Sequence, residues 1–208
     1  MNAAEELGKV AEEVSVCTSC ELHHSRKKAV PGEGPPDSDI MFIGEGPGFH
    51  ENEQGRPFVG AAGKLLEDLL AKIDLERSEV YIGNVVKCRP PGNRDPQVAE
   101  LSSCSVYLER QIQEINPKVI VTLGRYSLMH FMPNAKISDV HGQAMRVKGR
   151  LVVAMYHPAA GLHQRSLMST IEEDFKRIPE LIAKADRSAE VQEQPSAEKS
   201  EPKQLNLF

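Results

Sequence analysis

Asp39-Ile-Met-Phe-Ile-Gly-Glu-Gly-Pro-Gly48 decides the fold, because it is a short apolar run that ends in a glycine-rich loop. Its first half has the composition of a buried strand, and comparable runs rich in β-branched residues follow at 80–86, 118–123 and 151–155. Amphipathic stretches typical of helices lie at about 61–73, 97–115, 125–131 and 167–185. Apolar strands separated by helices indicate a parallel sheet that is covered on both faces. We therefore expect an α/β fold, a three-layer αβα sandwich with a mainly parallel four-stranded central sheet.

Length and charge are those of one soluble domain. The 208 residues are 40% hydrophobic, and no apolar run approaches the roughly 20 residues that cross a membrane. The chain opens MNAAEELGKVAEEV, without an apolar signal segment, so we expect a cytoplasmic protein and a monomer. The formal net charge is −5, of which residues 1–15 contribute −3 and residues 186–208 contribute −2, so the body between them is neutral. That body is compatible with contacts to nucleic-acid phosphates.

The four cysteines have the spacing of ligands for one inorganic centre. They are Cys17-x2-Cys20, Cys88 and Cys104. A tetrahedral zinc ion and an iron-sulfur cluster both need four converging thiolates. A zinc ribbon usually uses two close pairs, whereas only the first pair is close here, so the spacing favours a [4Fe-4S] cluster and leaves zinc as the alternative. Two disulfides or free thiols are a further alternative, which the absence of a signal segment disfavours.

Unusual residues follow the predicted strands, where ligands collect in parallel sheets. The loop Gly44–Gly48 lets the backbone approach a ligand closely, although such a loop is often only a turn. It is not a nucleotide-binding P-loop, because Leu65 stands where Ser or Thr would follow the lysine. Asn84 interrupts an apolar run and His157 follows the last strand. Taken alone, each has an ordinary structural explanation as a satisfied core amide or a capping histidine.

Together these segments resemble the family 4 uracil-DNA glycosylases, the iron-sulfur branch of the uracil-DNA glycosylase superfamily. The resemblance covers roughly residues 14–183. It rests on GEGPGFHENEQGRPFVGAAGKLL at 44–66, VYIGNVVKCRPPGNRDP at 80–96, INPKVIVTLGR at 115–125 and MYHPAAGL at 155–162. The resemblance implies that Cys17, Cys20, Cys88 and Cys104 bind a [4Fe-4S] cluster that acts as a structural staple. It also implies that the substrate is uracil-containing DNA.

The resemblance implies a pocket that reads a uracil base flipped out of DNA. Gly44, Glu45, Gly46, Pro47 and Gly48 would line it. Phe58 would stack on the base, and the Asn84 amide would donate to O4 and accept from N3–H. Cytosine has neither that N3–H group nor an acceptor at C4, so it would be rejected. We expect Glu51 or its neighbourhood to exclude the methyl group of thymine.

Cleavage of the glycosidic bond leaves negative charge on uracil. The resemblance implies that His157 donates a hydrogen bond to O2 of the departing anion. Related branches have a carboxylate or an amide where this chain has Gly46, so Glu45 and Glu51 are the candidates for the group that activates water. The motifs hold no lysine nucleophile and no base-trapping histidine. We therefore expect a monofunctional glycosylase that leaves an abasic site and initiates base excision repair, with Leu162 or Arg165 entering the DNA stack.

The C-terminal segment has a different composition. Residues 185–203 are rich in Ser, Glu, Gln, Lys and Pro, which predicts a disordered linker after a domain at 1–184. The chain ends QLNLF, similar to the bacterial sliding-clamp-binding pentapeptide, with Gln204, Leu205, Leu207 and Phe208 as the contacts. The alternative is a frayed tail that packs on the domain.

Two other functions would use part of this pattern. A non-catalytic, metal-stapled DNA-binding module tethered to the replication clamp accounts for the cysteines and the tail, but not for Phe58, Asn84 and His157 occurring together. A nucleotide-binding enzyme accounts for the glycine loop, yet the chain lacks a phosphate-binding lysine signature.

Overall fold

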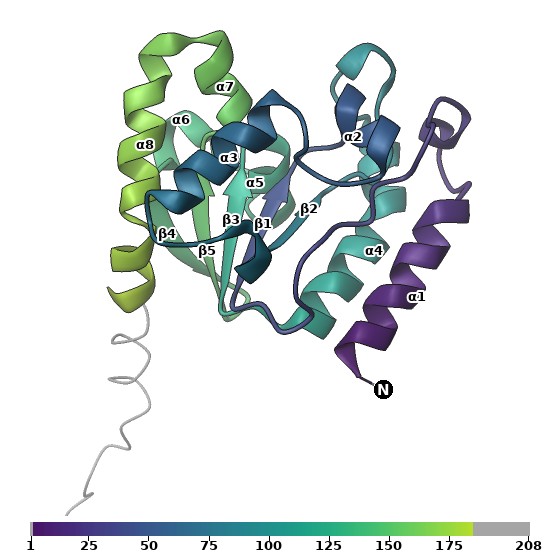
Figure 1. Cartoon of the computed structure of the whole chain (residues 1–208), viewed down its shortest axis with the longest axis horizontal. Helices are drawn as coiled ribbons and strands as arrows, with labels where there is room; N and C mark the ends of the chain where they lie inside the picture. Colours follow the sequence, from purple (N-terminus) through teal and green to yellow (C-terminus); the bar gives the residue numbers. More distant parts are fainter. Residues whose placement is uncertain (1, 185–208) are drawn as a thin grey trace, which may run out of the picture.

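The computed structural model describes residues 2–184 (Figure 1). The linker and the clamp-binding motif predicted at 185–203 and 204–208 lie outside these described residues. Within the described part, no helix is both long enough and apolar enough to span a membrane.

One mixed sheet forms the centre of the domain. Its strands are β1 (Ile40–Gly44), β2 (Tyr81–Asn84), β3 (Val119–Leu123), β4 (Gln143–Val147) and β5 (Arg150–Met155). The spatial order is β2-β1-β3-β5-β4, and every neighbouring pair is parallel except β4 with β5. The four predicted strands are all present, and the α/β class is confirmed.

The predicted number of strands was wrong, because β4 adds a fifth strand at the edge of the sheet. Its sequence, Gln143-Ala-Met-Arg-Val147, is partly exposed and has polar residues, as suits a strand with a neighbour on one side only. A two-residue turn at Lys148-Gly149 joins it to β5, and both turn residues have positive φ. Such a strand lacks the continuous apolar run by which the central strands were recognised.

Helices cover both faces of the sheet, which confirms the three layers (Figure 1). The α-helices include α1 (Ala3–Val16), α2 (Phe49–Gln54), α3 (Ala61–Ala71), α4 (Val98–Ile115), α5 (Arg125–Phe131), α6 (Ile137–Val140), α7 (Pro158–His163) and α8 (Met168–Lys176), and residues 178–184 are also helical. Short 3-10 helices lie at Glu21–His24, Arg77–Glu79, Pro91–Asn93 and Arg165–Leu167. The four predicted helices correspond to α3, α4, α5 and α8.

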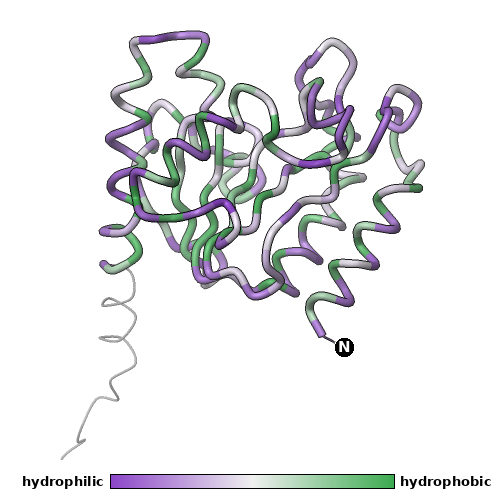
Figure 2. Tube along the Cα trace, in the orientation of Figure 1, coloured by the Kyte–Doolittle hydropathy of each residue, from purple (hydrophilic) through white to green (hydrophobic). Residues whose placement is uncertain are grey.

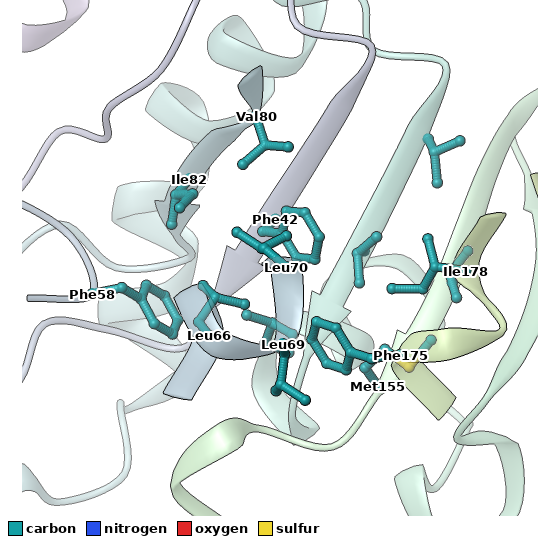
Figure 3. Close-up of a cluster of buried hydrophobic side chains, with 14 of the residues drawn as sticks. Phe42, Phe58, Leu66, Leu69, Leu70, Val80, Ile82, Met155, Phe175 and Ile178 are labelled. Atoms are coloured by element: carbon teal, nitrogen blue, oxygen red, sulfur yellow. The ribbon is translucent and has the colours of Figure 1, made fainter. Parts of the chain in front are cut away.

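Alternating residues of the strands feed two separate cores. Phe42 packs against Leu66, Leu69 and Leu70 of α3 and against Phe175 of α8 (Figure 3). Its neighbours Met41 and Ile43 point to the other face, where α4 contributes Leu108 and Ile112. Apolar residues accordingly concentrate along the central strands, while the loops and the outer turns of helices are more hydrophilic (Figure 2).

The N-terminal helix α1 was not predicted. It begins with a capping box in which Asn2 and Glu5 satisfy each other's backbone N–H groups, and it buries Val10 and Val14. The helix lies beside α4 (Figure 1), and Arg110 of α4 forms an ion pair with Glu13. This packing brings the following Cys17-x2-Cys20 segment next to the N-terminal half of α4.

Candidate active site

A cavity of about 410 Å³ opens at the carboxyl ends of the parallel strands. Gly44 and Asn84 are register partners at the ends of β1 and β2, and Leu123 and Met155 are partners at the ends of β3 and β5. The cavity is lined by Glu45, Gly46, Pro47, Gly48, Glu51, Phe58, Asn84 and His157, all predicted from the sequence, and by Ala62, Pro90, Asn93, Arg94, Ala159 and His163. The structure thus brings together segments that are far apart in the chain.

Gly44 is the one predicted pocket residue that does not line the cavity. It matters because it has no side chain, which leaves room for Asn84 and Phe58. A Cβ atom at this position would lie 2.5 Å from Asn84 Oδ1 and 2.7 Å from Phe58 Cζ. Gly46 is similarly confined, since its Cβ would lie 2.7 Å from a methyl carbon of Val86. These glycines let the walls of the cavity approach the strand ends closely.

Asn84 is a buried amide with an unused acceptor. Its side chain is 1% exposed, and among the described residues its Oδ1 is the one buried side-chain nitrogen or oxygen without a hydrogen-bond partner. Its backbone carbonyl accepts a hydrogen bond of 2.9 Å from Nζ of buried Lys87, which also donates to Gln111 Oε1 at 2.6 Å. An unpaired buried carbonyl costs about 1–3 kcal/mol, so the position favours a ligand that supplies an N–H group.

Phe58 forms the aromatic part of the wall. Its side chain is 5% exposed, and its ring stacks on the imidazole of His157 with centroids 5.5 Å apart and planes 23° apart. Its φ of +50° lies in the left-handed region, which is unusual for an aromatic residue. The segment that carries this ring is therefore held by contacts from outside itself.

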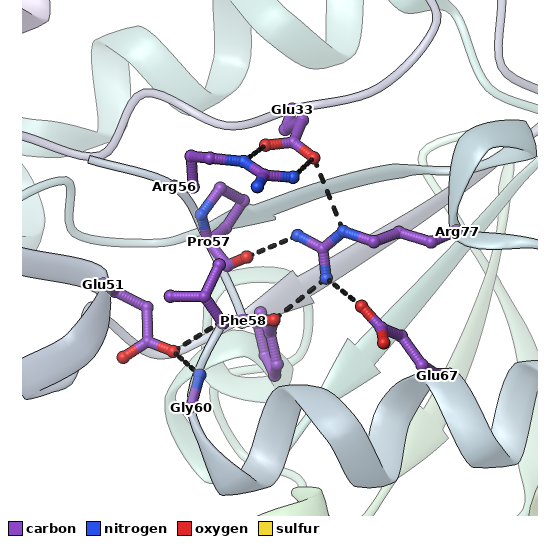
Figure 4. A network of polar contacts seen from close by, with 9 residues as sticks. Glu33, Glu51, Arg56, Pro57, Phe58, Gly60, Glu67 and Arg77 are labelled. Atoms are coloured by element: carbon purple, nitrogen blue, oxygen red, sulfur yellow. Dashed lines mark hydrogen bonds and ion pairs between the residues drawn. The ribbon is translucent and has the colours of Figure 1, made fainter. Parts of the chain in front are cut away.

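Glu51 provides one of those contacts (Figure 4). Its Oε1 accepts hydrogen bonds from the N–H groups of Val59 at 2.8 Å and Gly60 at 2.9 Å. One oxygen of this carboxylate is thus engaged in fixing the segment after Phe58. A Cβ on Gly48 would lie 2.7 Å from the other oxygen, Oε2, so this oxygen lies close to the glycine loop.

Glu45 is the other acidic residue of the cavity wall. Burial raises the pKa of Glu45 above its ordinary value, with a further rise from the Asp95 carboxylate and an opposing effect from Arg125. A carboxylate with a raised pKa is a stronger base once it has ionised.

His157 is a neutral hydrogen-bond donor at physiological pH. Burial lowers its pKa to about 4, against the opposing effect of Glu51. Its Nδ1 accepts a hydrogen bond of 3.1 Å from the N–H of Ala159 at the start of α7. Since Nδ1 is an acceptor, the single proton of the neutral ring is on Nε2.

The four cysteines line a second, smaller cavity together with Val14, Leu22, Arg26, Lys87 and Tyr107 among others. None forms a disulfide, so the disulfide alternative was wrong. The Lys87 N–H points at Cys104 Sγ at 3.2 Å, and Arg26 Nη1 points at Cys88 Sγ at 3.4 Å. Within residues 2–184, no three Cys, His, Asp or Glu side chains form a group that could hold a metal ion.

Some residues of the pocket were missed. Pro90, Asn93 and Arg94 belong to the loop after Cys88, and Arg94 is held by a bidentate pair with Glu100 at 2.9 and 2.6 Å. The sequence feature that could have indicated these pocket residues is their position directly after Cys88, a predicted cluster ligand. Leu162, one of the two predicted intercalating residues, is 44% exposed on α7, and Arg165 lies in the next turn.

Comparisons with known proteins agree with this geometry. The family model described as the uracil DNA glycosylase superfamily matches residues 31–179. The type-4 uracil-DNA glycosylase of Sulfurisphaera tokodaii is 49% identical over 187 residues, 84% of each chain. That of Archaeoglobus fulgidus is 45% identical over 189 residues, 86% of this chain and 95% of the relative. A type-5 uracil-DNA glycosylase of Thermus thermophilus is 35% identical over 151 residues, 62% of this chain and 68% of the relative. The chain therefore belongs to the uracil-DNA glycosylase superfamily and, within it, to the type-4 enzymes.

Proposed function

We propose that this protein excises uracil from DNA and thereby initiates base excision repair. The observation that carries the proposal is the buried Oδ1 of Asn84, which has no hydrogen-bond partner among residues 2–184 and shares a cavity with an aromatic ring and a neutral histidine. Uracil offers what this wall lacks, because its N3–H is a donor and its ring is flat and stackable. Family membership supports the same conclusion.

Base selection follows from the amide of Asn84. Its Oδ1 accepts from N3–H and its amide nitrogen donates to O4 of uracil. Cytosine presents an amino group at C4 and no proton at N3, so both contacts would be lost inside a buried site. We propose that the Glu51 carboxylate, fixed by the N–H groups of Val59 and Gly60, closes the space where thymine carries its methyl group.

Bond cleavage uses His157 and Glu45. As the bond between N1 and C1′ breaks, its electron pair moves into the uracil ring, and Nε2–H of His157 donates to the O2 atom on which charge collects. A water molecule then attacks C1′ and transfers its proton to the Glu45 carboxylate. The neutral state of His157 suits this role, because the ring enters the reaction as a donor. Among residues 2–184 no lysine lines the cavity, so the proposed product is an abasic site, as expected of a monofunctional enzyme.

We propose that Cys17, Cys20, Cys88 and Cys104 hold a [4Fe-4S] cluster. The chemistry of the donor set supports this proposal, because four cysteine side chains line one partly enclosed space and N–H groups are directed at the sulfur atoms of Cys88 and Cys104. The bound cluster supplies a structural link and no redox step. It would join the segment after α1, the loop after β2 and helix α4, and so hold the pocket loop that contains Pro90 and Asn93.

The DNA-facing surface is proposed to surround the pocket mouth. Leu162 is exposed on α7 beside His163 of the pocket wall, which supports Leu162 over Arg165 as the residue that enters the stack. At the start of α2, the exposed ring of Phe49 lies under the guanidinium of Arg89, whose Cζ is 5.3 Å from the ring centroid. The clamp-binding role of Gln204, Leu205, Leu207 and Phe208 rests on the sequence QLNLF alone.

A single-uracil oligonucleotide tests the function directly. Protein purified without oxygen should yield alkali-sensitive strand breaks in the uracil strand and none in the matching thymine strand. Breaks that appear without alkali would contradict the monofunctional assignment. Binding without any release of uracil would favour the non-catalytic DNA-binding module instead.

A further inference from the structure

The strained backbone at Phe58 is held from two sides. On the amide side, Glu51 takes the N–H groups of the two residues that follow. On the inner side, α3 packs so closely that a Cβ on Gly63 would lie 1.9 Å from the Phe58 carbonyl oxygen. Neither contact is a hydrogen bond to the backbone carbonyl groups of Pro57 and Phe58. A third residue, Arg77, donates to both.

The Arg77 guanidinium donates hydrogen bonds to the backbone carbonyl groups of Pro57 and Phe58 (Figure 4). Its Nη1 donates to Phe58 O at 2.9 Å and its Nη2 to Pro57 O at 2.5 Å. The guanidinium is itself oriented by Glu33 and Glu67, each 3.4 Å away, and the side chain is 17% exposed. Only a planar fork with several fixed N–H donors matches two neighbouring acceptors in this way, and a lysine ammonium lacks that geometry.

We infer that Arg77 is a positioning residue for uracil excision, which holds the Phe58 ring in the plane where the flipped base stacks. Arg77 lies in the 3-10 helix before β2, outside the residues that line the cavity, so it acts through the backbone at 57–58. Arg77 thereby connects the stacking ring to the strand that ends in Asn84. The inference rests on the proposed function.

The matched control is Arg56, because it belongs to the same network. Arg56 forms a bidentate pair with Glu33 at 2.6 and 2.7 Å, so its guanidinium donates to this carboxylate rather than to the Phe58 backbone. Arg56→Met and Arg77→Met therefore each remove a cation from Glu33, while only Arg77→Met releases the two carbonyl groups. Arg77→Lys keeps a positive charge beside Glu33 and Glu67. It is the test variant to use if Arg77→Met does not fold.

The experiment measures kcat on a uracil oligonucleotide and the inhibition constant of free uracil for all three variants. We expect both Arg77 variants to lose about 10- to 100-fold in kcat and to bind free uracil more weakly, since small misplacements at a reacting site can cost about 10²-fold. Arg56→Met should stay within about twofold of the parent. Amide hydrogen exchange of the peptide 55–63 should accelerate in the Arg77 variants alone.

A double-mutant cycle with Phe58→Ala separates positioning from general stability. If Arg77 acts through the ring, Arg77→Met has little further effect once the ring is gone, whereas independent effects add. Unchanged kcat in both Arg77 variants, an equal loss in Arg56→Met, or additive losses in the cycle would each overturn the inference. A parent protein that releases no uracil would instead overturn the proposed function.

Discussion

At the scale of single residues, Asn84 combines almost complete burial with an acceptor that has no partner among residues 2–184. We expect Asn84→Ala to reduce uracil release by about 10- to 100-fold for each hydrogen bond lost, yet not to lower the melting temperature, because the unpaired carbonyl is removed. Asn52 is the control: its buried Oδ1 already accepts from the Lys27 N–H at 2.9 Å, so Asn52→Ala should destabilise the fold. Calorimetry beside the uracil assay checks both, and a melting temperature that falls equally in the two variants would contradict the assignment of Asn84.

The titration of the two groups proposed to act in catalysis, His157 and Glu45, belongs to the same scale. The pKa of His157 is lowered to about 4, so down to about that pH the ring stays neutral, with its one proton on Nε2. The pKa of Glu45 is raised, and a general base fails when it is protonated, so kcat should fall as the pH drops through the raised Glu45 value. Single-turnover rates between about pH 4 and 8 measure this acid limb. In Glu45→Gln the residual single-turnover rate should no longer fall at acidic pH. If the rate still falls in this variant, another group is responsible for the acid limb.

At the scale of elements, the tight approach of β1 to β2 makes a glycine necessary at the strand end. Gly44→Ala would push a methyl group against Asn84 Oδ1 and the Phe58 ring, so we expect a loss of uracil release of the order of 10²-fold. Gly149→Ala in the hairpin turn is the matched variant, because its φ is +82° but its Cβ would meet open space. It should lower stability by about 1 kcal/mol and leave the rate unchanged. Equal rates for both variants would show that the space at Gly44 is not needed.

At the scale of the whole molecule, the four cysteines belong to three parts of the chain, which are the segment after α1, the loop after β2 and helix α4. We expect Cys104→Ala to lose the visible absorbance of an iron-sulfur cluster and to melt at a lower temperature, because the cluster's free energy of binding contributes to folding. Ser103→Ala changes the neighbouring side chain of the same cavity and should keep both properties. Full absorbance in Cys104→Ala would remove this cysteine from the ligand set.

The last five residues, 204–208, are proposed to bind a partner protein, and this prediction also belongs to the scale of the whole molecule. Deletion of residues 204–208 should leave uracil release from a free oligonucleotide unchanged, because the residues proposed to bind uracil and cleave its bond all lie between 44 and 157. It should abolish binding to a bacterial sliding clamp in a pull-down or titration experiment, for which Leu207→Ala with Phe208→Ala is the milder variant. Clamp binding that survives the deletion would show that the QLNLF segment is not the contact.

Local sequence patterns were sufficient to predict much of the fold and many residues of the candidate site. The four parallel strands, helices α3, α4, α5 and α8, and the residues at the strand ends were all predicted. Burial on both faces of the sheet imposes apolar runs on the strands, and ligands of parallel sheets collect at the strand ends, where unusual residues stand out. Helix α1 and strand β4 were missed because each has a mixed composition. Helices α2, α6 and α7 were missed because they have only 6, 4 and 6 residues, too few to show a helical period.

The sequence by itself determined the α/β class, the family resemblance, the four cysteines and the group of Phe58, Asn84 and His157, because these are properties of residue type and order along the chain. Only the tertiary structure decided which groups are satisfied and which are not. The unpaired Oδ1 of Asn84, the donor side of His157 and the grip of Arg77 on the Phe58 backbone each depend on the distance between atoms that belong to different elements. Such distances arise from packing, and packing is a property of the folded chain rather than of any one segment.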